Sequence, residues 1–234
     1  MNTNSGIEWT DGLTWNPIRG CSRTSPGCVH CYAEQIAARF SGTHLRDVDG
    51  EAVECEDPFH GFAEFRIIGG KREAHWTGRV ELMEDKLREP LSKERWAKAF
   101  ADKHGRKPRC FANSMSDLFH EKLPFDKIDR VFSVMALAEW IDFLVLTKRG
   151  ERMHEYFGPS DELDGLTRDV LVEGGAQNLY EKRTGEDPSM WLAVHWPLKN
   201  VWLGVSCENQ EYADKRIPWL LYMEIGRASC RARV

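Results

Sequence analysis

The chain has 234 residues, of which 41% are hydrophobic and 29% charged, a composition typical of an ordinary globular protein. Its formal net charge of −5 gives no reason to expect nucleic-acid binding, although it leaves room for a local basic groove. No apolar run approaches the length of a membrane span, so we expect no contact with a membrane. Seven cysteines without a secretory signal indicate a reducing cytoplasm and not a disulfide framework.

Three clustered cysteines are the most informative feature of the N-terminal part. Cys21, Cys28 and Cys31 follow the spacing C-x6-C-x2-C, and the first two lie in a loop rich in Gly, Ser, Thr and Pro. Thiolates are soft ligands that suit zinc and iron–sulfur clusters. Three thiols predict either a four-iron cluster whose fourth iron is open, or zinc with His30 or a distant residue as fourth ligand. His30 is poorly placed to share a metal with both of its neighbours, which favours the cluster.

The rest of the chain alternates between strand-like and helical patterns. Apolar residues from Tyr32 to Phe40 fall on one helical face. We predict strands at 79–83, 109–114, 143–147 and 201–206, and helices beginning near Pro90, Asp126, Glu151 and Tyr212. The run Phe143–Thr147 is typical of a parallel strand covered on both faces. Residues 41–78 have the irregular, charged composition of an insertion. Residues 158–195 have the polar composition of a second insertion.

This alternation predicts an α/β fold with a parallel sheet or barrel. In such folds the chemistry lies at the carboxyl ends of the strands. The polar residues expected there are Asn113, Ser114, Ser116 and Asp117 after one strand, Lys148 and Arg149 after the next, and Ser206 and Glu208 after the last. The cysteine loop follows the first strand and would lie on the same rim.

Each of these residues also has a purely structural interpretation. The functional interpretation of Ser114, Ser116 and Asp117 is cofactor binding, and the structural one is capping of a turn. For Lys148 and Arg149 the alternatives are neutralising a phosphate or carboxylate and ending a strand in solvent. For Glu208 they are proton transfer and the start of a helix. His120, beside two apolar residues, is more often structural than catalytic.

The C-terminal segment 224–234 resembles translated sequencing-adapter DNA, and a basic tail is the alternative interpretation. We therefore treat residues 1–223 as a single domain and expect the natural chain to continue beyond about Met223.

Several motifs carry a resemblance to a known family. Ile7–Asp11, Thr14–Pro17, Gly20-Cys21, Ser25–Cys28 and Cys31–Glu34 resemble a phage and prophage family of three-Cys-motif proteins of unknown function. Later blocks also match, at Phe111–His120, Leu146–Arg149 and Trp196–Ser206, so the resemblance spans most of residues 7–209.

That family is similar in turn to radical S-adenosylmethionine (SAM) enzymes, in which three cysteines bind a four-iron cluster and SAM chelates the open iron. The resemblance implies a partial parallel (β/α) barrel of radical-SAM type, truncated at its C-terminus, with Cys21, Cys28 and Cys31 as ligands. It places His30 where a planar ring packs against the cofactor. The expected cofactor-binding residues are His30, Tyr32, Asn113, Ser114, Ser116, Asp117, Lys148, Ser206 and Glu208.

The chain departs from the usual radical-SAM pattern in its first cysteine gap, which is six residues and not three. In radical-SAM enzymes a glycine-rich run after the second strand usually meets the amino group of SAM. This chain has no such run, and Glu81 is only a weak substitute for it. The resemblance also implies the cytoplasm of a bacterial host and a partner protein encoded nearby, while the substrate stays open. The rival hypothesis is a non-catalytic zinc-binding module acting in a phage protein complex.

Overall fold

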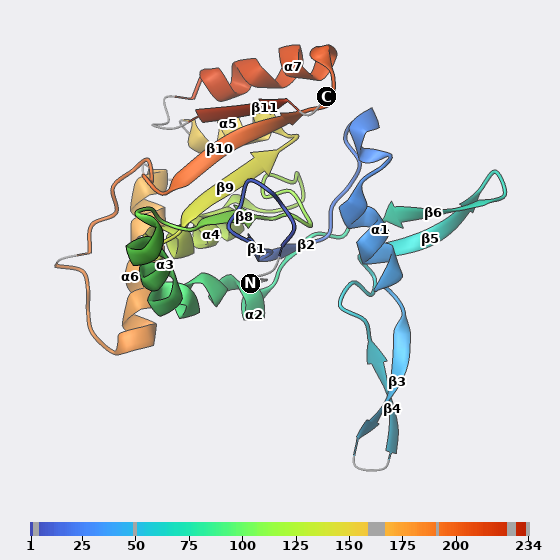
Figure 1. Ribbon diagram of the computed structural model, residues 1–234, viewed down its shortest axis with the longest axis horizontal. Helices are drawn as coiled ribbons and strands as arrows, with labels where there is room; N and C mark the ends of the chain where they lie inside the picture. The colour runs from blue at the N-terminus through green and yellow to red at the C-terminus, as the bar shows by residue number, and fades with distance from the viewer. Residues whose placement is uncertain (2–4, 49–50, 159–166, 191, 224–227, 233–234) are drawn as a thin grey trace.

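The computed structural model describes residues 1, 5–48, 51–158, 167–190, 192–223 and 228–232. A parallel sheet organises the fold, with the order β1 (Leu13–Trp15), β8 (Arg109–Ala112), β9 (Asp142–Thr147) and β10 (Val201–Cys207), extended by β11 (Ala228–Ala232) (Figure 1). The α/β class with parallel strands is therefore confirmed. Among the described strands, β1 and β11 form opposite edges, so the sheet is open and does not form a closed barrel.

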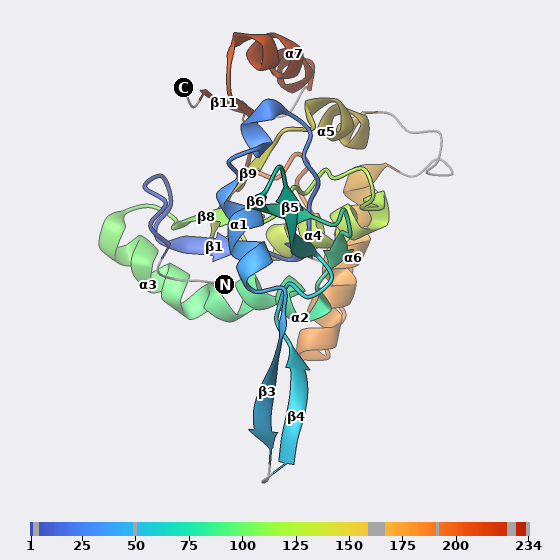
Figure 2. The ribbon, with the colours of Figure 1, turned by 90° about the vertical axis from the view of Figure 1, so that its right-hand side faces the viewer.

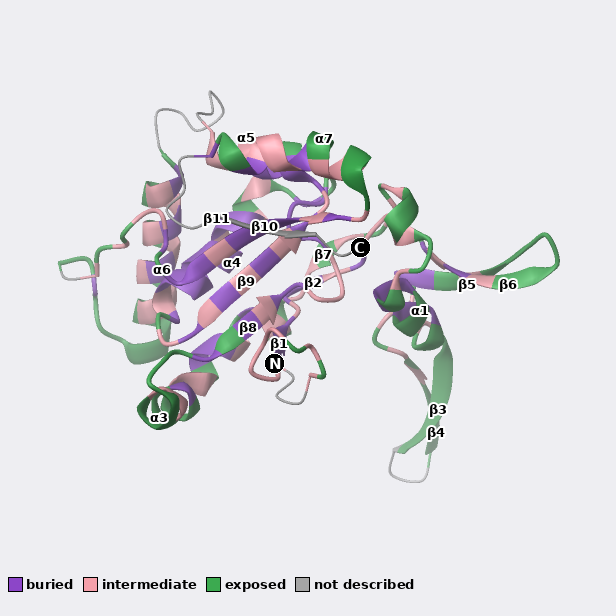
Figure 3. Ribbon diagram, turned by 45° about the horizontal axis from the view of Figure 1, so that its top comes forward, coloured by how far each residue is buried: buried purple, intermediate pink, exposed green. Residues whose placement is uncertain are grey.

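One face of the sheet carries the core. Phe143 and Val145 of β9 are buried together with Ile128, Phe132 and Met135 of α4 (Phe125–Leu137). Leu144 and Leu146 point to the other face and are only half-buried, an alternation that Figure 3 shows along β9. The prediction that this strand is covered on both faces was wrong. Near the carboxyl end the second face borders a cavity, which Leu146 lines.

The remaining helices flank this framework. α5 (Gly150–Phe157) and α7 (Gln210–Leu221) pack against each other, and α7 also packs on β10. α6 (Arg168–Thr184), which falls in the second expected insertion, packs along α4. The helix expected from Pro90 begins as a 3-10 turn, η2 (Glu89–Lys93), after the short α2 (Glu84–Leu87), and becomes α3 at Glu94–His104.

A small antiparallel pair leads into the cysteine segment. β2 (Ile18–Arg19) pairs with β7 (Glu81–Leu82), so the strand expected at 79–83 is shorter and lies outside the parallel sheet. The cysteine loop then passes through η1 (Pro26–Cys28) into α1 (Tyr32–Arg39). At Gly20, φ is +88° and an added Cβ would lie 1.9 Å from the Arg79 carbonyl oxygen, so only glycine fits where the loop leaves β2.

Residues 41–78 form two β-hairpins, which corrects the expectation of an irregular insertion. β3 (Thr43–Val48) pairs with β4 (Glu51–Glu56), and β5 (Ala63–Ile68) pairs with β6 (Lys71–Trp76). Figures 1 and 2 show that the two ribbons leave the body in different directions. Their outer parts face solvent on both sides, so they lack the apolar alternation by which strands are detected in sequences. The positive φ angles of Gly69 and Gly70 suit a tight hairpin turn.

The C-terminal strand lies in the segment that resembles adapter sequence. Ala228–Ala232 pairs in parallel with Leu203–Cys207 of β10. This pairing does not test the origin of the segment, and the division into residues 1–223 and a foreign tail stays a prediction. None of the described helices combines the length and the apolar character that a membrane span requires.

The Asn200 side chain connects α4 to the parallel sheet. It is buried, and its Nδ2 donates to the carbonyl oxygens of Met135 at 2.9 Å and Ile141 at 3.1 Å. We predict that Asn200→Ala lowers the free energy of unfolding by roughly 1–3 kcal/mol, because buried carbonyls lose their donor. Urea titration measures this change, with the exposed Gln210→Ala as control. Equal stability of the two variants would contradict the role assigned to Asn200.

Candidate functional site

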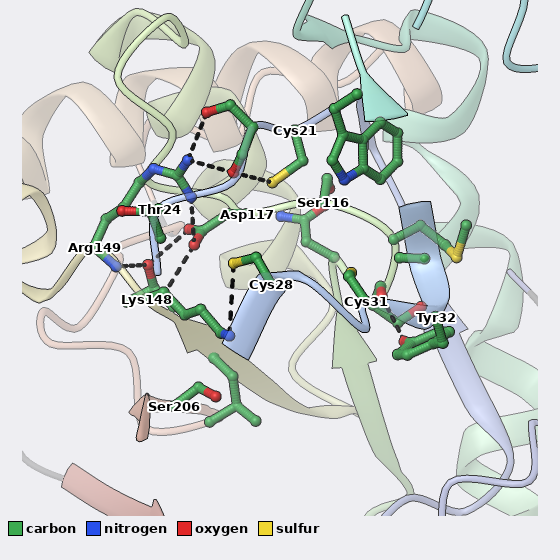
Figure 4. Close-up of a pocket in the computed structure, with 18 of the residues that line it drawn as sticks. Cys21, Thr24, Cys28, Cys31, Tyr32, Ser116, Asp117, Lys148, Arg149 and Ser206 are labelled. Carbon is green, nitrogen blue, oxygen red and sulfur yellow. Dashed lines mark hydrogen bonds and ion pairs between the residues drawn. The ribbon is translucent and has the colours of Figure 1, made fainter. Parts of the chain in front are cut away.

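A cavity of about 220 Å³ lies at the carboxyl ends of the parallel strands (Figure 4). The cysteine segment, the connection after β8, and the ends of β9 and β10 all contribute to its wall. Polar and sulfur-bearing residues lie on one part, and Trp9, Trp76, Phe111 and Leu146 supply apolar surface. The site therefore occupies the rim at which parallel α/β sheets usually place their chemistry.

All three clustered cysteines line this cavity, each from a different local structure. Cys21 follows β2, Cys28 ends η1, and Cys31 is the N-cap residue of α1. Burial raises the pKa of Cys21 to about 12, with Asp117 adding to the shift and Arg149 opposing it. Burial also raises the pKa of Cys31. These surroundings favour the protonated thiols over bare thiolates.

Cys28 lies in a different electrostatic environment. Burial opposes its ionisation, but hydrogen bonds from the backbone of Thr24 and Ser25 and the Lys148 ammonium together lower its pKa. The Lys148 Nζ is 3.7 Å from Cys28 Sγ and 3.8 Å from a carboxylate oxygen of Glu208. Glu208 also accepts a hydrogen bond from Arg216 at 2.8 Å. Lys148 is thus held between a thiol and a carboxylate at the cavity wall.

Gly27 allows the η1 turn to lie close to the Glu208 side chain. A Cβ at Gly27 would lie 2.9–3.0 Å from the side chain of Glu208, too close for any other residue without displacement. The η1 turn therefore rests directly against the end of β10.

A buried ion pair attaches the cysteine loop to the sheet. Arg149 is 7% exposed and donates to Asp117 at 3.0 Å, to Glu121 at 2.7 Å, and to the carbonyl and hydroxyl oxygens of Ser22 at 3.1 and 3.0 Å. Asp117 also accepts from the Thr147 hydroxyl at 2.7 Å. Because Ser22 directly follows Cys21, the guanidinium sets the position of the first cysteine.

His120 completes this cluster. Its Nδ1 accepts the backbone N–H of Lys122 at 3.1 Å, so the neutral ring carries its proton on Nε2 and donates it to the Ser22 hydroxyl at 2.8 Å. Burial and the neighbouring Arg149 lower the pKa of His120 to about 4. A histidine with both nitrogens committed to loop anchoring serves structure, as its sequence context suggested.

A second anchor joins the cysteine segment to β6. Glu34 is 1% exposed and accepts the backbone N–H of Trp76 at 2.9 Å and Nε of Arg23 at 2.9 Å. Arg23 in turn donates to the Ala74 carbonyl at 2.9 Å. Trp76, which lines the cavity, is therefore held against the segment that carries the cysteines.

Asn113 is the most unusual residue of the wall. Among the described residues it is the only non-glycine with positive φ, at 59°. It is 2% exposed, and its Oδ1 accepts the Ile18 N–H at 3.4 Å, whereas its Nδ2 has no hydrogen-bond partner in the described chain. Asn tolerates the left-handed backbone, so the unmatched buried donor is the feature that sets Asn113 apart from the rest of the wall.

Comparison with known proteins identifies a family. The chain matches the family described as "Protein of unknown function (DUF5131)" over residues 4–231. It belongs to the DUF5131 family. No curated protein and no solved structure matches it. The match includes most of 224–234 and provides no support for a foreign origin of that segment.

In this DUF5131 protein, the cavity brings together most of the residues expected from the sequence. The three cysteines line it together with Tyr32, Asn113, Ser114, Ser116, Asp117, Lys148 and Ser206. His30 is exposed, and both His30 and Glu208 lie outside the described lining, with a Glu208 carboxylate oxygen 3.8 Å from the Lys148 Nζ. Some of the lining groups are already engaged by the protein. Ser116 donates to the Ile18 carbonyl at 3.0 Å, and the Tyr32 hydroxyl donates to the Ser114 carbonyl at 2.6 Å.

Several contributors were not predicted. Asn16 accepts the Met115 N–H at 2.9 Å and fixes the turn after β8, and Glu34 forms the second anchor. Both lie inside the motifs that carry the family resemblance, which was the available signal. Trp76 reaches the cavity from the segment 41–78, in which the sequence gave no signal of a site residue.

A second cavity lies next to the first. It has about 700 Å³ of space beside α5 and α7, and Thr24, Lys148 and Arg149 line both cavities.

As the side chains stand, no group of three or more His, Cys, Asp or Glu residues in the described chain could hold a metal ion. Binding of a single metal ion would require the three cysteine sulfurs to converge on one point. A four-iron cluster requires a wider separation of the sulfurs, because each thiolate binds a different iron.

The His120 environment predicts acid sensitivity. The folded-state pKa is lowered from 6.5 to about 4, so the unfolded chain binds the proton first as pH falls. Stability is fully present above about pH 6.5 and decreases as pH falls toward 4, by roughly 2 kcal/mol at pH 5.

Urea titrations at pH 7.5 and 5.0 measure this loss, and His120→Gln should reduce it while retaining a hydrogen-bonding side chain. Equal pH dependence in the wild type and in His120→Gln would contradict the assignment to His120.

Proposed function

We propose that this DUF5131 protein is an iron–sulfur enzyme that uses SAM for radical chemistry. The observation that carries the proposal is the convergence of Cys21, Cys28 and Cys31 on one cavity at the carboxyl rim of a parallel sheet. Three thiols from one short segment suit a four-iron cluster with one iron open to a small molecule. When bound, cluster and SAM would supply a carbon radical that abstracts hydrogen from a substrate.

The donor set favours a cluster over zinc. A structural zinc site needs four protein ligands converging on one ion. His30, the candidate for a fourth ligand, is exposed and lies outside the cavity lining. A zinc-binding module in a phage protein complex remains the rival hypothesis.

Other residues of the cavity have roles that follow from their contacts. The Lys148 ammonium beside Cys28 would offset the negative charge of a thiolate-ligated centre. Arg149 and Asp117 would hold Cys21 in place, since they anchor its neighbour Ser22. Asn113 would donate its buried, unpaired Nδ2 to an acceptor on the small-molecule ligand after a local shift of the wall exposes it. Trp76, Phe111 and Leu146 would exclude water from the reacting centre.

The finer parts of the resemblance belong to this proposal. They are a phage or prophage origin, the cytoplasm of a bacterial host, a nearby partner protein, and a partial barrel completed by sequence beyond about Met223. The role of His30 as a ring against the cofactor belongs here too, and its exposure gives that role no geometric support.

Metal content is the decisive test. We expect anaerobically purified protein to contain iron and acid-labile sulfide in equal amounts, and the triple variant Cys21→Ala, Cys28→Ala, Cys31→Ala to lose both. Cys55→Ala is the matched control, because Cys55 lies in the β3–β4 hairpin outside the cavity. Zinc without sulfide would overturn the cluster and favour the binding module.

The Asn113 amide predicts a separable effect on SAM. Asn113→Asp keeps the acceptor for Ile18 and tolerates the left-handed backbone, but it removes the donor and adds negative charge. We expect SAM affinity, measured by anaerobic equilibrium dialysis, to fall at least about tenfold, with iron content unchanged.

Asn209→Asp is the matched control, because Asn209 caps α7 outside the cavity lining and should bind SAM like the wild type. Unchanged affinity in Asn113→Asp would remove Asn113 from the ligand site.

A further inference from the structure

The β3–β4 hairpin is an isolated ribbon. Apart from their mutual pairing, β3 and β4 have no extensive packing with any other described helix or strand. Every described residue of the ribbon is exposed except Cys55, which is half-buried. A two-stranded ribbon in water is marginally stable by itself, so this geometry calls for a covering partner.

One face of this ribbon is acidic around an apolar centre. The register places Leu45 opposite Glu54, Thr43 opposite Glu56, and Asp47 opposite Ala52, so these six side chains share one face. Leu45 is 72% exposed. The face carries the carboxylates of Asp47, Glu54 and Glu56, whereas Arg46 lies on the opposite face. Glu56 lies 3.7 Å from His60 and Asp47 also has a partner, so Glu54 and Leu45 are the groups that suit a partner with positive charge and apolar surface.

The tip of β5–β6 has the opposite character. Residues 65–72 read Phe-Arg-Ile-Ile-Gly-Gly-Lys-Arg, with three cations and no acid. Ile67 and Ile68 are 72% and 46% exposed. Arg66 is paired with Glu64, which leaves Lys71 and Arg72 to supply the net charge of the tip. The Arg72 guanidinium stacks 3.8 Å from the Phe65 ring centre and is thereby held near Ile67, its cross-strand neighbour.

We propose that the chain associates with a second copy of itself, the β5–β6 tip of each copy packing on the acidic face of the partner's β3–β4 hairpin. Ile67 and Arg72, which share one face of the tip, would pack on Leu45 and meet Glu54, while Lys71 on the other face would add positive charge to the same contact. One ribbon contact is small beside the roughly 1,200–2,000 Å² of a stable interface. Two-fold symmetry makes the contact twice and uses both hairpins of each copy.

Charge complementarity selects this partner over a polyanion. Nucleic acid or an anionic membrane would attract the tip, but it would leave the acidic face uncovered and repel it. A second copy carries both signs and satisfies both hairpins. The inference is independent of the proposed chemistry, because neither hairpin surface contributes to the cysteine cavity beyond Trp76 at the base of β6.

Charge-reversed variants of the full chain test the interface. We expect light scattering of the wild type at micromolar concentration to give twice the mass of the chain, decreasing toward one chain as salt rises. The tip variant Lys71→Glu, Arg72→Glu and the ribbon variant Glu54→Lys, Glu56→Lys should each be monomeric, since like charges would meet at both contacts. The control Lys103→Glu, an exposed reversal on α3, should remain dimeric.

The decisive sample is an equimolar mixture of the two variants. The reversed tip then faces the reversed ribbon, and the native tip faces the native ribbon, so both contacts regain opposite charges and the dimer should reform. Misfolding of either variant cannot produce this recovery. A mixture that stays monomeric would overturn the proposal, as would a monomeric wild type that binds a 20-base-pair DNA duplex through Lys71 and Arg72.

Discussion

The ion pair between Arg149 and Asp117 is the interaction on which the site depends. A buried guanidinium must have its donors matched, because an unpaired buried charge costs several kcal/mol. Here the matching groups come from separate parts of the chain: Asp117 and Glu121 follow β8, and Ser22 belongs to the cysteine segment. Satisfying one side chain therefore brings the loop onto the sheet rim. The position of Cys21, directly before Ser22, follows from this requirement.

The second anchor explains how a hairpin far along the chain becomes part of the wall. Glu34 is buried at the start of α1 and accepts from both Arg23 and the backbone of Trp76. Because a buried carboxylate needs several donors, the loop, the helix and β6 are held as one unit. The apolar cluster of Ala33, Ala37 and Ala38 with Ala63 and Ala74 supports the same junction. The small side chains let α1 approach the base of the ribbon, so the junction resists separation of the hairpin from the cysteines.

The sequence predicted the parallel α/β framework and most of the cavity, because both rest on local signals. Buried strands such as Val201–Cys207 form apolar runs, and polar residues directly after them must meet at one edge. The hairpins escaped prediction, since ribbons solvated on both faces leave no apolar alternation. The second face of β9 was also misjudged, because an apolar run does not reveal that Leu146 borders a cavity. Trp76 was missed for a third reason: its role arises from a tertiary junction and from no local pattern.

Two kinds of unmet interaction distinguish this molecule, and they lie in different places. Inside the cavity, the Asn113 amide lacks an acceptor while the backbone holds it at positive φ. The surrounding turn is fixed by Asn16 and Ser116, so this buried donor stays unmatched in the described part of the chain. Outside, Leu45 and Ile67 are exposed on ribbons of opposite charge, and the proposed association would cover them. A small molecule cannot meet the second need, and a partner surface cannot enter to meet the first. The proposed ligand binding and the proposed association would therefore occur at separate places, connected through β6, whose base reaches the cavity and whose tip reaches solvent.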